Sequence, residues 1–424
     1  MPLDTHDDAG GHLALLYQLS QTFNSSLDLD EVLNRVMDEV IAATHAERGF
    51  VMLIETDGKL AFRVARGLDQ TTINDPQFQV SRSVTERVAR EGQPVLTSDA
   101  QTDERFNIRQ SIVLLGLRSI LCVPLSLKGR TIGVIYVDNR LQAGIFTQAD
   151  LRLLNAIASS AAIAIENARL YQLAVEKGRL EQELLMARRV QMGLLPRQLP
   201  SIPGWEFIVR WKPARQVGGD YYDFIQIEDG QLGLVIADVT DKGMPAALFM
   251  AFTRSIIRAN LDHASDPAAG ITRANRLICQ ESERGLFVTL FYGLLNPQTG
   301  QIVYVNAGHN PPVQVTSPRP GQPCLVTWLA GTGMPLGVEE ESVYTQNVIQ
   351  LNSGDFIVLY TDGITEAIDA DDNQFGMERL EQVLLDNQGK TSSQIVAALE
   401  RAIDQFTGDS APFDDITVLI ARRQ

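Results

Sequence analysis

Residues 215–243 read R-Q-V-G-G-D-Y-Y-D-F-I-Q-I-E-D-G-Q-L-G-L-V-I-A-D-V-T-D-K-G, and they decide the fold of the second half of the chain. Two strand-like runs flank the segment Glu228-Asp229-Gly230. A three-residue loop with glycine in the left-handed position is a common connection between antiparallel strands. We therefore predict a hairpin that turns at these three residues.

In this hairpin Ile227 faces Gln231, so Asp220 lies directly opposite Asp238. Like charges that face each other destabilise a sheet, and a divalent cation would offset their repulsion. A two-residue loop at Asp229-Gly230 would instead shift the register by one and put the carboxylates on opposite faces. Taken alone, the pair predicts either a metal site or two solvated aspartates at strand ends.

Composition limits the class of protein. The chain has 424 residues, too long for one typical core, so two domains and a connector are expected. A formal net charge of −16, from 36 basic and 52 acidic residues, argues against nucleic acid or an anionic membrane as the main partner. The three cysteines, Cys122, Cys279 and Cys324, are far apart and predict neither a disulfide framework nor a zinc site.

Targeting signals are not evident in the sequence. The N-terminus reads M-P-L-D-T-H-D-D, which is unlike a signal peptide. The apolar run at residues 156–165 is broken by Ser159 and Ser160 and is too short to span a bilayer. We expect a cytoplasmic protein that does not bind a membrane.

The first half of the chain alternates helices and strands around a variable middle. A helix begins at Asp28, which forms a capping box with Glu31, and strand-like runs cover residues 49–55 and 59–66. Later come S-I-L-C-V-P-L-S-L-K-G-R-T-I-G-V-I-Y-V-D-N-R (119–140) and F-T-Q-A-D-L-R-L-L (146–154). This order resembles a GAF domain, a small ligand-sensing α/β module, over residues 28–168, after a helical extension at 1–27. The resemblance implies a small-molecule or protein signal of unknown identity.

Some GAF domains that bind cyclic nucleotides carry N-K, a later F and then D-E. Asn139-Arg140, Phe146 and Asp150 match this pattern loosely, but Leu151 stands in place of Glu. Structural roles explain the same residues, with Phe146 in the core and Asp150 at a helix start. Cys122 lies in an apolar strand, where a buried thiol acts as a small hydrophobe.

A long helix is predicted over residues 147–195, which contain no proline and only two glycines, Gly178 and Gly193. Two sets of residues in it recur every seven positions: Leu173, Leu180, Ala187 and Leu194, and then Leu170, Lys177, Leu184 and Gln191. This spacing is typical of a coiled coil with two polar seam residues. We predict a signalling helix at 169–195 that makes a homodimer; the alternative is a helix packed on its own domains.

Two further aspartates stand at predicted strand ends. Asp362 follows the apolar run 356–361, and Asp414 precedes the run 416–420. If these strands are antiparallel neighbours, both aspartates lie at the same end of the sheet. Oxygen ligands suit Mg²⁺ or Mn²⁺, and two such ions about 3.5–4 Å apart can activate a water for attack on phosphorus. Strand-end aspartates are also common turn formers.

The elements of residues 196–424 predict a second domain. Strands, then helices, then strands are typical of an α/β sandwich with antiparallel sheets, and a proline-rich surface loop is expected at 311–323. The whole chain is thus predicted as a multi-domain α/β protein.

Six motifs follow one another in this second domain. They are G-G-D-Y-Y-D-F (218–224), A-D-V-T-D-K-G-M-P-A-A-L (237–248), F-V-T-L-F-Y-G (287–293), N-A-G-H-N-P-P (306–312), Y-T-D-G-I-T-E-A (360–367) and D-D-I-T (414–417). In this order they closely resemble the metal-dependent (PPM) serine/threonine protein phosphatases, in the branch named for SpoIIE and RsbU. By that resemblance Asp238 would bridge two Mn²⁺ or Mg²⁺ ions, and Asp220 would bind one of them with the carbonyl of Val239. Asp362 and Asp414 would hold the other ion.

Three more residues are candidates for supporting roles. Asp415 is expected behind the metal ligands rather than as a direct ligand. Asp241 stands where many relatives have glycine, in G-D-V-S-G-K-G, and it could alter the loop or add an outer carboxylate. His309 allows a general-acid role, but its motif favours a role in shaping the loop.

The resemblance implies a GAF-regulated protein serine/threonine phosphatase whose substrate is a phosphorylated signalling protein, an anti-sigma-factor antagonist. The alternative is a catalytically degenerate sensor scaffold with the same fold. The G-G-D turn of diguanylate cyclases is also similar, but Tyr221 stands where that chemistry needs an acid. A histidine kinase would need a histidine on the dimer helix, and residues 147–195 contain none.

Overall fold

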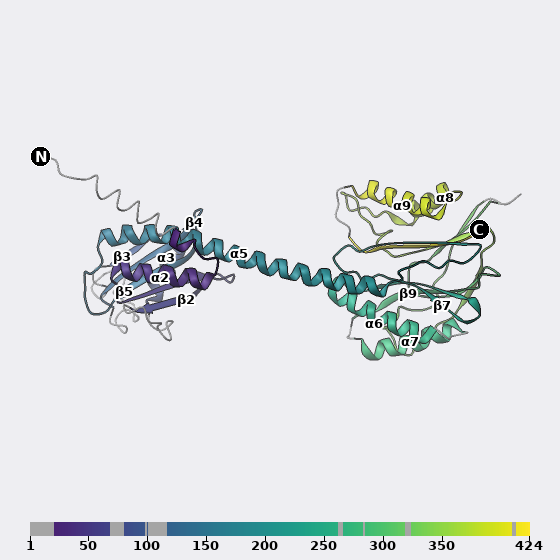
Figure 1. The fold of residues 1–424 in the computed structure, drawn as a ribbon, viewed down its shortest axis with the longest axis horizontal. Coiled ribbons are helices and arrows are strands. Elements are labelled where there is room, and N and C mark those ends of the chain that lie inside the picture. The colour runs from purple at the N-terminus through teal and green to yellow at the C-terminus, as the bar shows by residue number, and fades with distance from the viewer. Residues whose placement is uncertain are drawn as a thin grey trace. The chain divides into compact units, whose positions relative to one another are not determined.

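The structure is a computed structural model that describes residues 21–67, 80–97, 100, 117–261, 266–282, 285–318, 324–408 and 413–424. The chain divides into two compact units, Met1–Leu180 and Glu181–Gln424, whose helices and strands are labelled in Figure 1. The helical extension predicted at residues 1–27 and the variable middle at 71–117 lie largely outside the described residues.

The described residues of the first unit form an antiparallel sheet in the order β2-β1-β5-β4-β3. Its strands are β1 (Arg48–Ile54), β2 (Leu60–Gly67), β3 (Val95–Thr97), β4 (Ser119–Leu127) and β5 (Arg130–Asn139). Helix α2 (Leu29–Thr44) and the first part of α5 (Gln148–Leu194) pack on one face, and α3 (Arg82–Glu91) packs on the other. Helix α2 begins as predicted, with Asp28 accepting a hydrogen bond from the Glu31 N–H, but the predicted capping box is incomplete because the Asp28 N–H donates to Ser26 Oγ.

Helix α5 is 47 residues long and runs without a break from the first unit into the second. Its beginning is buried through Leu154, Ile157 and Ala161 in the core of the first unit. Its middle exposes about half of several apolar side chains, which are Leu170, Tyr171, Leu173, Val175 and Leu180. The prediction that Gln191 occupies a seam position is wrong, because this side chain is buried within the second unit and bonded to Gly218.

In the second unit, the residues that the structure describes form two five-stranded antiparallel sheets. One has the order β13-β10-β9-β8-β7 and is made of β7 (Tyr221–Gln226), β8 (Leu232–Val239), β9 (Val288–Leu295), β10 (Gln301–Ala307) and β13 (Asn347–Gln350). The other has the order β12-β11-β14-β15-β6 and is made of β6 (Trp205–Lys212), β11 (Val313–Thr316), β12 (Leu325–Trp328), β14 (Phe356–Tyr360) and β15 (Ile416–Arg423).

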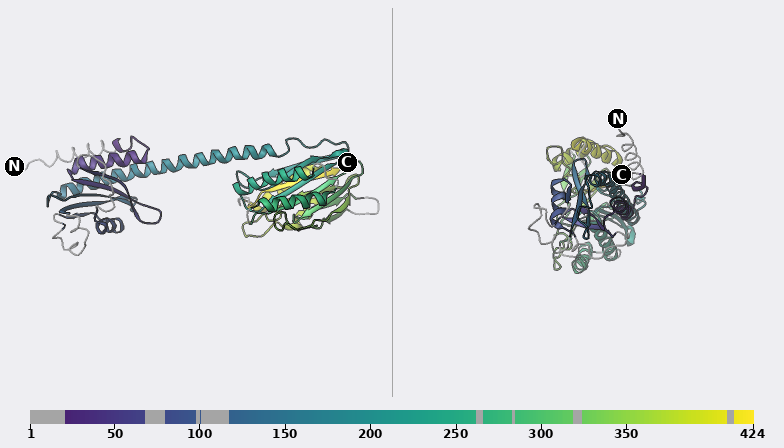
Figure 2. Two further views of the ribbon diagram at one scale, coloured as in Figure 1. Left: turned by 90° about the horizontal axis from the view of Figure 1, so that it is seen from below. Right: turned by 90° about the vertical axis from the view of Figure 1, so that its left-hand side faces the viewer.

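Helices cover the outer face of each sheet, as Figures 1 and 2 show. Helices α6 (Met244–Leu261) and α7 (Pro267–Glu281) pack on the first sheet, while α8 (Gly376–Asn387) and α9 (Ser392–Thr407) pack on the second. Between the sheets lies a third apolar layer that includes Phe224, Phe291 and Leu359. The predicted α/β sandwich with antiparallel sheets is confirmed.

The hairpin of β7 and β8 has the predicted register. Tyr221 pairs with Ala237 and Gln226 with Leu232, so Asp220 and Asp238 stand opposite each other just beyond the last pair. The loop is closed by a hydrogen bond from the Ile227 N–H to the Gln231 carbonyl at 3.0 Å. Both Asp229 and Gly230 are left-handed, with φ of 60° and 73°, whereas the sequence predicted that conformation for glycine alone.

The proline-rich segment predicted as a surface loop contains strand β11. Val313 and Val315 are buried there, and they pair with Val358 and Phe356 of β14. Across the described residues, none of the helices combines the length and the apolar character that crossing a membrane would need.

Candidate metal centre

Four of the predicted aspartates come together at one end of the two sheets. Asp220 and Asp238 belong to the β7–β8 hairpin, while Asp362 follows β14 and Asp414 precedes β15. Strands β14 and β15 are antiparallel neighbours that pair Tyr360 with Val418, so their aspartates share one end. The charges of Asp362 and Asp414 act on Asp238 from the opposite sheet. The second half of the chain therefore gathers these carboxylates from four different strand ends.

The side chain of Asp220 is held by the sheet that contains β14 and β15, although Asp220 directly precedes β7 of the other sheet. Only 1% of its surface is exposed, and its Oδ2 accepts hydrogen bonds from the hydroxyls of Thr361, at 2.8 Å, and Thr417. The two threonines are joined in turn, because the Thr417 N–H donates to Thr361 Oγ1 at 3.0 Å. This network fixes Oδ2 of Asp220.

Burial and mutual repulsion oppose ionisation of the cluster. Burial and the charges of Asp238 and Asp415 raise the pKa of Asp220 well above its usual range, and burial with the charge of Asp362 raises that of Asp238. Burial and the charges of Glu366 and Asp414 raise the pKa of Asp362 to about 6. A bound divalent cation would remove this penalty by favouring the charged form of each carboxylate.

Lys242 supplies positive charge at the edge of the cluster. Its Nζ lies 2.8 Å from Asp414 Oδ2 and donates to the Phe413 carbonyl at 2.6 Å, and it also lies 4.0 Å from the centre of the Phe413 ring. As the side chains stand, no three His, Cys, Asp or Glu groups among the described residues form a compact metal-binding set. The donors nevertheless fit hard cations, because all are carboxylate or carbonyl oxygens.

The two glycines before Asp220 are required by close packing. A Cβ atom at Gly218 would lie 2.2 Å from Asp415 Oδ2, and one at Gly219 would lie 2.9 Å from the carbonyl oxygen of Val239. The absence of side chains therefore lets this loop lie against both groups. It also brings the Val239 carbonyl next to Gly219, one residue before Asp220, and the family resemblance expects this carbonyl to bind metal.

Asp415 differs from its neighbour Asp414 in what it contacts. Its Oδ1 accepts from the Ala214 N–H and its Oδ2 from the Gly219 N–H, both at 2.7 Å. Both carboxylate oxygens are thus used to hold the loop that leads to Asp220.

Asp241 and His309 have local roles. Asp241 has a φ of 77°, a conformation that glycine adopts freely and aspartate tolerates, and its Oδ1 accepts from the Lys242 N–H at 2.7 Å. His309 is buried, which lowers its pKa to about 4, and its Nδ1 lies 2.9 Å from Thr289 Oγ1. A neutral histidine at physiological pH is a poor proton donor.

Three contacts at this site were missed by sequence reasoning: the hydroxyls of Thr361 and Thr417 and the ammonium of Lys242. Each lies within a motif that was singled out for its aspartates, Y-T-D-G, D-D-I-T and D-K-G. The threonines were the available signal, because Thr361 is adjacent to Asp362 and Thr417 is three residues after Asp414, at the same end of the sheet.

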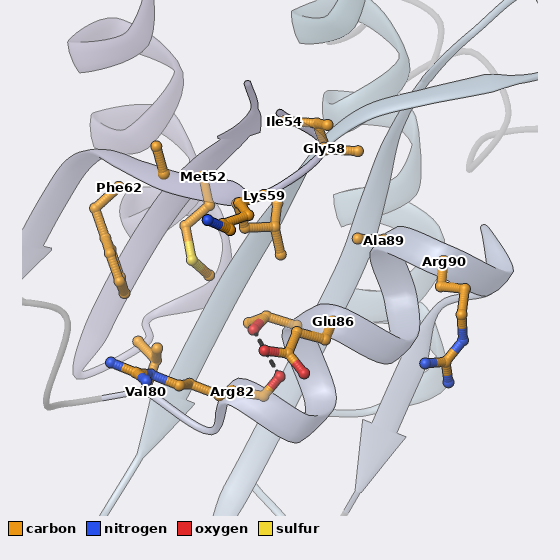
Figure 3. A pocket seen from close by; sticks show the side chains of 13 residues that line it. Met52, Ile54, Gly58, Lys59, Phe62, Val80, Arg82, Glu86, Ala89 and Arg90 are labelled. Carbon is orange, nitrogen blue, oxygen red and sulfur yellow. Dashed lines mark hydrogen bonds between the residues drawn. The ribbon is translucent and has the colours of Figure 1, made fainter. Parts of the chain in front are cut away.

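A cavity of about 890 Å³ lies in the first unit, between β1, β2 and α3 (Figure 3). Its lining combines apolar side chains, including Met52, Phe62 and Val80, with the charged groups of Lys59, Arg82, Glu86 and Arg90. Three basic side chains against one acidic side chain favour an anionic or amphipathic ligand.

The residues that loosely match the cyclic-nucleotide pattern have structural roles. Phe146 is buried in the core, and Asn139 accepts hydrogen bonds from the Leu141 and Gln142 N–H groups. Asp150 accepts a bond from the Thr147 N–H at the start of α5. Cys122 is fully buried, and burial raises the pKa of its thiol.

Two family models match the chain. Residues 26–166 match the model of the GAF domain, and residues 228–424 match that of stage II sporulation protein E, SpoIIE. These matches agree with the two resemblances that the sequence motifs carry, and the SpoIIE match includes Asp238, Asp362 and Asp414.

Two curated proteins are each similar to more than half of the chain. Protein IcfG of Synechocystis sp. is 29% identical over 276 residues, which cover 59% of this chain and 43% of IcfG. Phosphoserine phosphatase RsbU of Bacillus subtilis is 28% identical over 247 residues, which cover 58% of this chain and 71% of RsbU. The matched stretch thus spans less than half the length of IcfG.

The SiaA-PP2C domain of Pseudomonas aeruginosa is similar in structure. Its TM-score is 0.54 at 21% identity, and the match covers 59% of this chain and the whole of that domain. This likeness shows that the sandwich of two sheets and four helices has the PP2C fold.

Proposed function

Because the chain joins a GAF domain to a domain of the SpoIIE family, we propose that it is a metal-dependent protein phosphatase regulated by its GAF domain. Its substrate would be phosphoserine or phosphothreonine on a signalling protein. The similarity to RsbU, which is named a phosphoserine phosphatase, supports this reaction. An anti-sigma-factor antagonist is the substrate that the family resemblance favours.

The observation that carries the proposal is the cluster of aspartates at one end of the two sheets, in which Asp220 is buried and the others are partly exposed. Asp238 would bridge two Mn²⁺ or Mg²⁺ ions, and Asp220 would bind one of them with the Val239 carbonyl. Asp362 and Asp414 would hold the other ion. When bound, the ions would lower the pKa of a water molecule and neutralise charge on the phosphoryl group.

The remaining residues of the site orient these ligands. Thr361 and Thr417 fix Oδ2 of Asp220, and Asp415 fixes the loop before it. The side chain of Lys242 is 31% exposed beside Asp414. It therefore offers a positive charge to a phosphoryl dianion that approaches the cluster from solvent.

Hydrolysis of a phosphoserine peptide in the presence of Mn²⁺ tests the proposal. We expect Asp238→Asn to lose Mn²⁺ binding and several orders of magnitude in turnover, because a neutral amide is a poor bridge between two dications and the uncatalysed reaction is extremely slow. Asp229→Asn, at the far tip of the same hairpin, is the matched control and should keep both. Equal turnover in the two variants would contradict the metal site, and an inactive wild-type protein would favour the degenerate scaffold.

The exposed apolar side chains of α5 support a homodimer as a second part of the proposal. Leu170, Leu173 and Leu180 lie on predicted seam positions and are each about half exposed. A second copy of the same helix would bury them in parallel register. The seam would end before Gln191, which is already buried against its own domain.

A further inference from the structure

Gln191 makes both of its side-chain hydrogen bonds with one residue, Gly218. Its Nε2 donates to the Gly218 carbonyl at 2.5 Å, and its Oε1 accepts from the Gly218 N–H at 3.2 Å. Only 4% of the Gln191 surface is exposed. A buried amide is unfavourable unless its donors and acceptors are paired, so this contact is an integral part of the fold.

The contact lies directly beside the candidate metal centre. Gly218 precedes Gly219 and Asp220, and the Gly219 N–H is held by Asp415 at 2.7 Å. Gln191 thus holds Gly218 from the end of α5, while Asp415 holds the next residue from the start of β15. The backbone that carries Asp220 is fixed through two separate side chains.

The end of α5 is also anchored by packing. Leu195, one residue beyond the helix, is buried in the apolar cluster that contains Tyr221 and Val239. These residues follow Asp220 and Asp238 in the sequence. The residue that follows the helix therefore shares an apolar core with both strands of the hairpin that presents the two central aspartates.

We propose that Gln191 is a positioning residue for the metal centre. Through its contact with Gly218, Gln191 couples the last turn of α5 to the affinity of the Asp220 site for divalent cations. The inference rests on the proposed function and deepens it. Helix α5 is continuous from Gln148 to Leu194, and its beginning is buried in the core of the first unit. A displacement of its last turn would move Gly218 and with it Asp220.

The test compares full-length Gln191→Met and Gln191→Glu with wild-type protein. Gln191→Met keeps the side-chain length but leaves both backbone groups of Gly218 without a partner. Gln191→Glu keeps an acceptor for the Gly218 N–H but places a carboxylate against its carbonyl. Gln182→Ala, at an exposed position of the same helix, is the matched control.

Mn²⁺ affinity is measured by calorimetry, and hydrolysis of a phosphoserine peptide is measured over a range of Mn²⁺ concentrations. We expect the Kd for Mn²⁺ to rise about tenfold in both Gln191 variants, which is the loss expected for one or two buried hydrogen bonds. The kcat should fall at low Mn²⁺ and recover at saturating Mn²⁺, with an unchanged KM for the peptide. Gln182→Ala should match the wild-type protein throughout.

Hydrogen exchange at the Gly218 amide gives a readout that does not depend on activity. Its protection should be lost in Gln191→Met and kept in Gln182→Ala. A folded Gln191 variant with wild-type Mn²⁺ affinity would overturn the inference. If Gln191→Met does not fold, the Mn²⁺ affinity of Gln191→Glu tests the inference instead. Wild-type protein that binds Mn²⁺ but hydrolyses no phosphoester would overturn the proposed function alone, because the Mn²⁺ affinities would still test Gln191.

Discussion

The carboxylate of Asp415 accepts a hydrogen bond from the Gly219 N–H at 2.7 Å, although the two residues are 196 positions apart in the chain. Its other oxygen accepts from the Ala214 N–H. The adjacent Asp414 instead faces Lys242, with 2.8 Å between Nζ and Oδ2. Two neighbouring aspartates of one motif thus have different tasks, since one holds the loop before Asp220 and the other faces the cluster.

This division predicts different effects of the same substitution at the two positions. Asp415→Asn should lower the free energy of unfolding by about 1–3 kcal/mol, because its NH₂ group leaves one buried backbone N–H without an acceptor. Asp414→Asn should leave stability nearly unchanged but reduce the number of Mn²⁺ ions bound. Urea denaturation and calorimetric titration with Mn²⁺ measure both effects. The reverse pattern, with Mn²⁺ stoichiometry lost only in Asp415→Asn, would identify Asp415 as the ligand.

The lowered pKa of His309 predicts that the free energy of unfolding depends on pH. Burial lowers its pKa to about 4 in the folded state, while an unfolded histidine titrates near 6.5. Between these values the unfolded chain binds the proton and the folded chain does not. The stability that the neutral side chain contributes is therefore complete above pH 6.5 and is lost as the pH falls towards 4, by about 3 kcal/mol.

Chemical denaturation of wild-type protein and His309→Asn from pH 4 to pH 8 measures this effect. The difference between their free energies of unfolding should change only below pH 6.5. The pH profile of turnover should keep the same shape in both proteins, because a neutral buried histidine does not transfer the proton. Loss of the alkaline limb of that profile in His309→Asn would instead indicate a general acid.

The hairpin register and the strand-end aspartates were predictable because each depends on local sequence. The turn at Asp229-Gly230 fixes which residues of β7 and β8 face each other, and the apolar runs of β14 and β15 locate Asp362 and Asp414 at strand ends. Neighbouring antiparallel strands then bring these ends together. Such features need only the period of a strand and the chemistry of a turn.

The features that sequence reasoning missed depend on partners far along the chain. Strands β11, β12 and β13 have four residues each, too few for a clear alternating pattern, and β11 is recognisable by its pairing with β12 and β14. Gln191 was assigned to a dimer seam because a helical period looks the same whether a face meets a second copy or its own domain. Only the contact with Gly218 separates these possibilities.

A dimer through the middle of α5 predicts that charge placed on its apolar face yields monomers. Leu173 and Leu180 are about half exposed and lie two helical turns apart. The double variant Leu173→Asp with Leu180→Asp would place like charges opposite each other in a parallel pair. Light scattering should give the monomer mass for this variant and the dimer mass for Gln182→Asp, an exposed control position. A double variant that stays dimeric would show that another surface makes the interface.

The position of Gln191 also predicts where the chain can be shortened without loss of hydrolysis. A chain that begins at Glu183 keeps Gln191, Leu195 and the whole metal centre, so it should retain Mn²⁺-dependent turnover, at a rate altered by the loss of the GAF domain. A chain that begins at Pro196 lacks the partner of Gly218, so its Mn²⁺ affinity should be about tenfold weaker. Mn²⁺ titrations followed by phosphopeptide hydrolysis compare the two, and circular dichroism first establishes that both are folded.

If the shorter chain is folded and binds Mn²⁺ as tightly as the longer one, the end of α5 does not support the site. If the longer chain is folded and binds Mn²⁺ but hydrolyses nothing while the full-length protein is active, the GAF domain contributes to the chemistry itself.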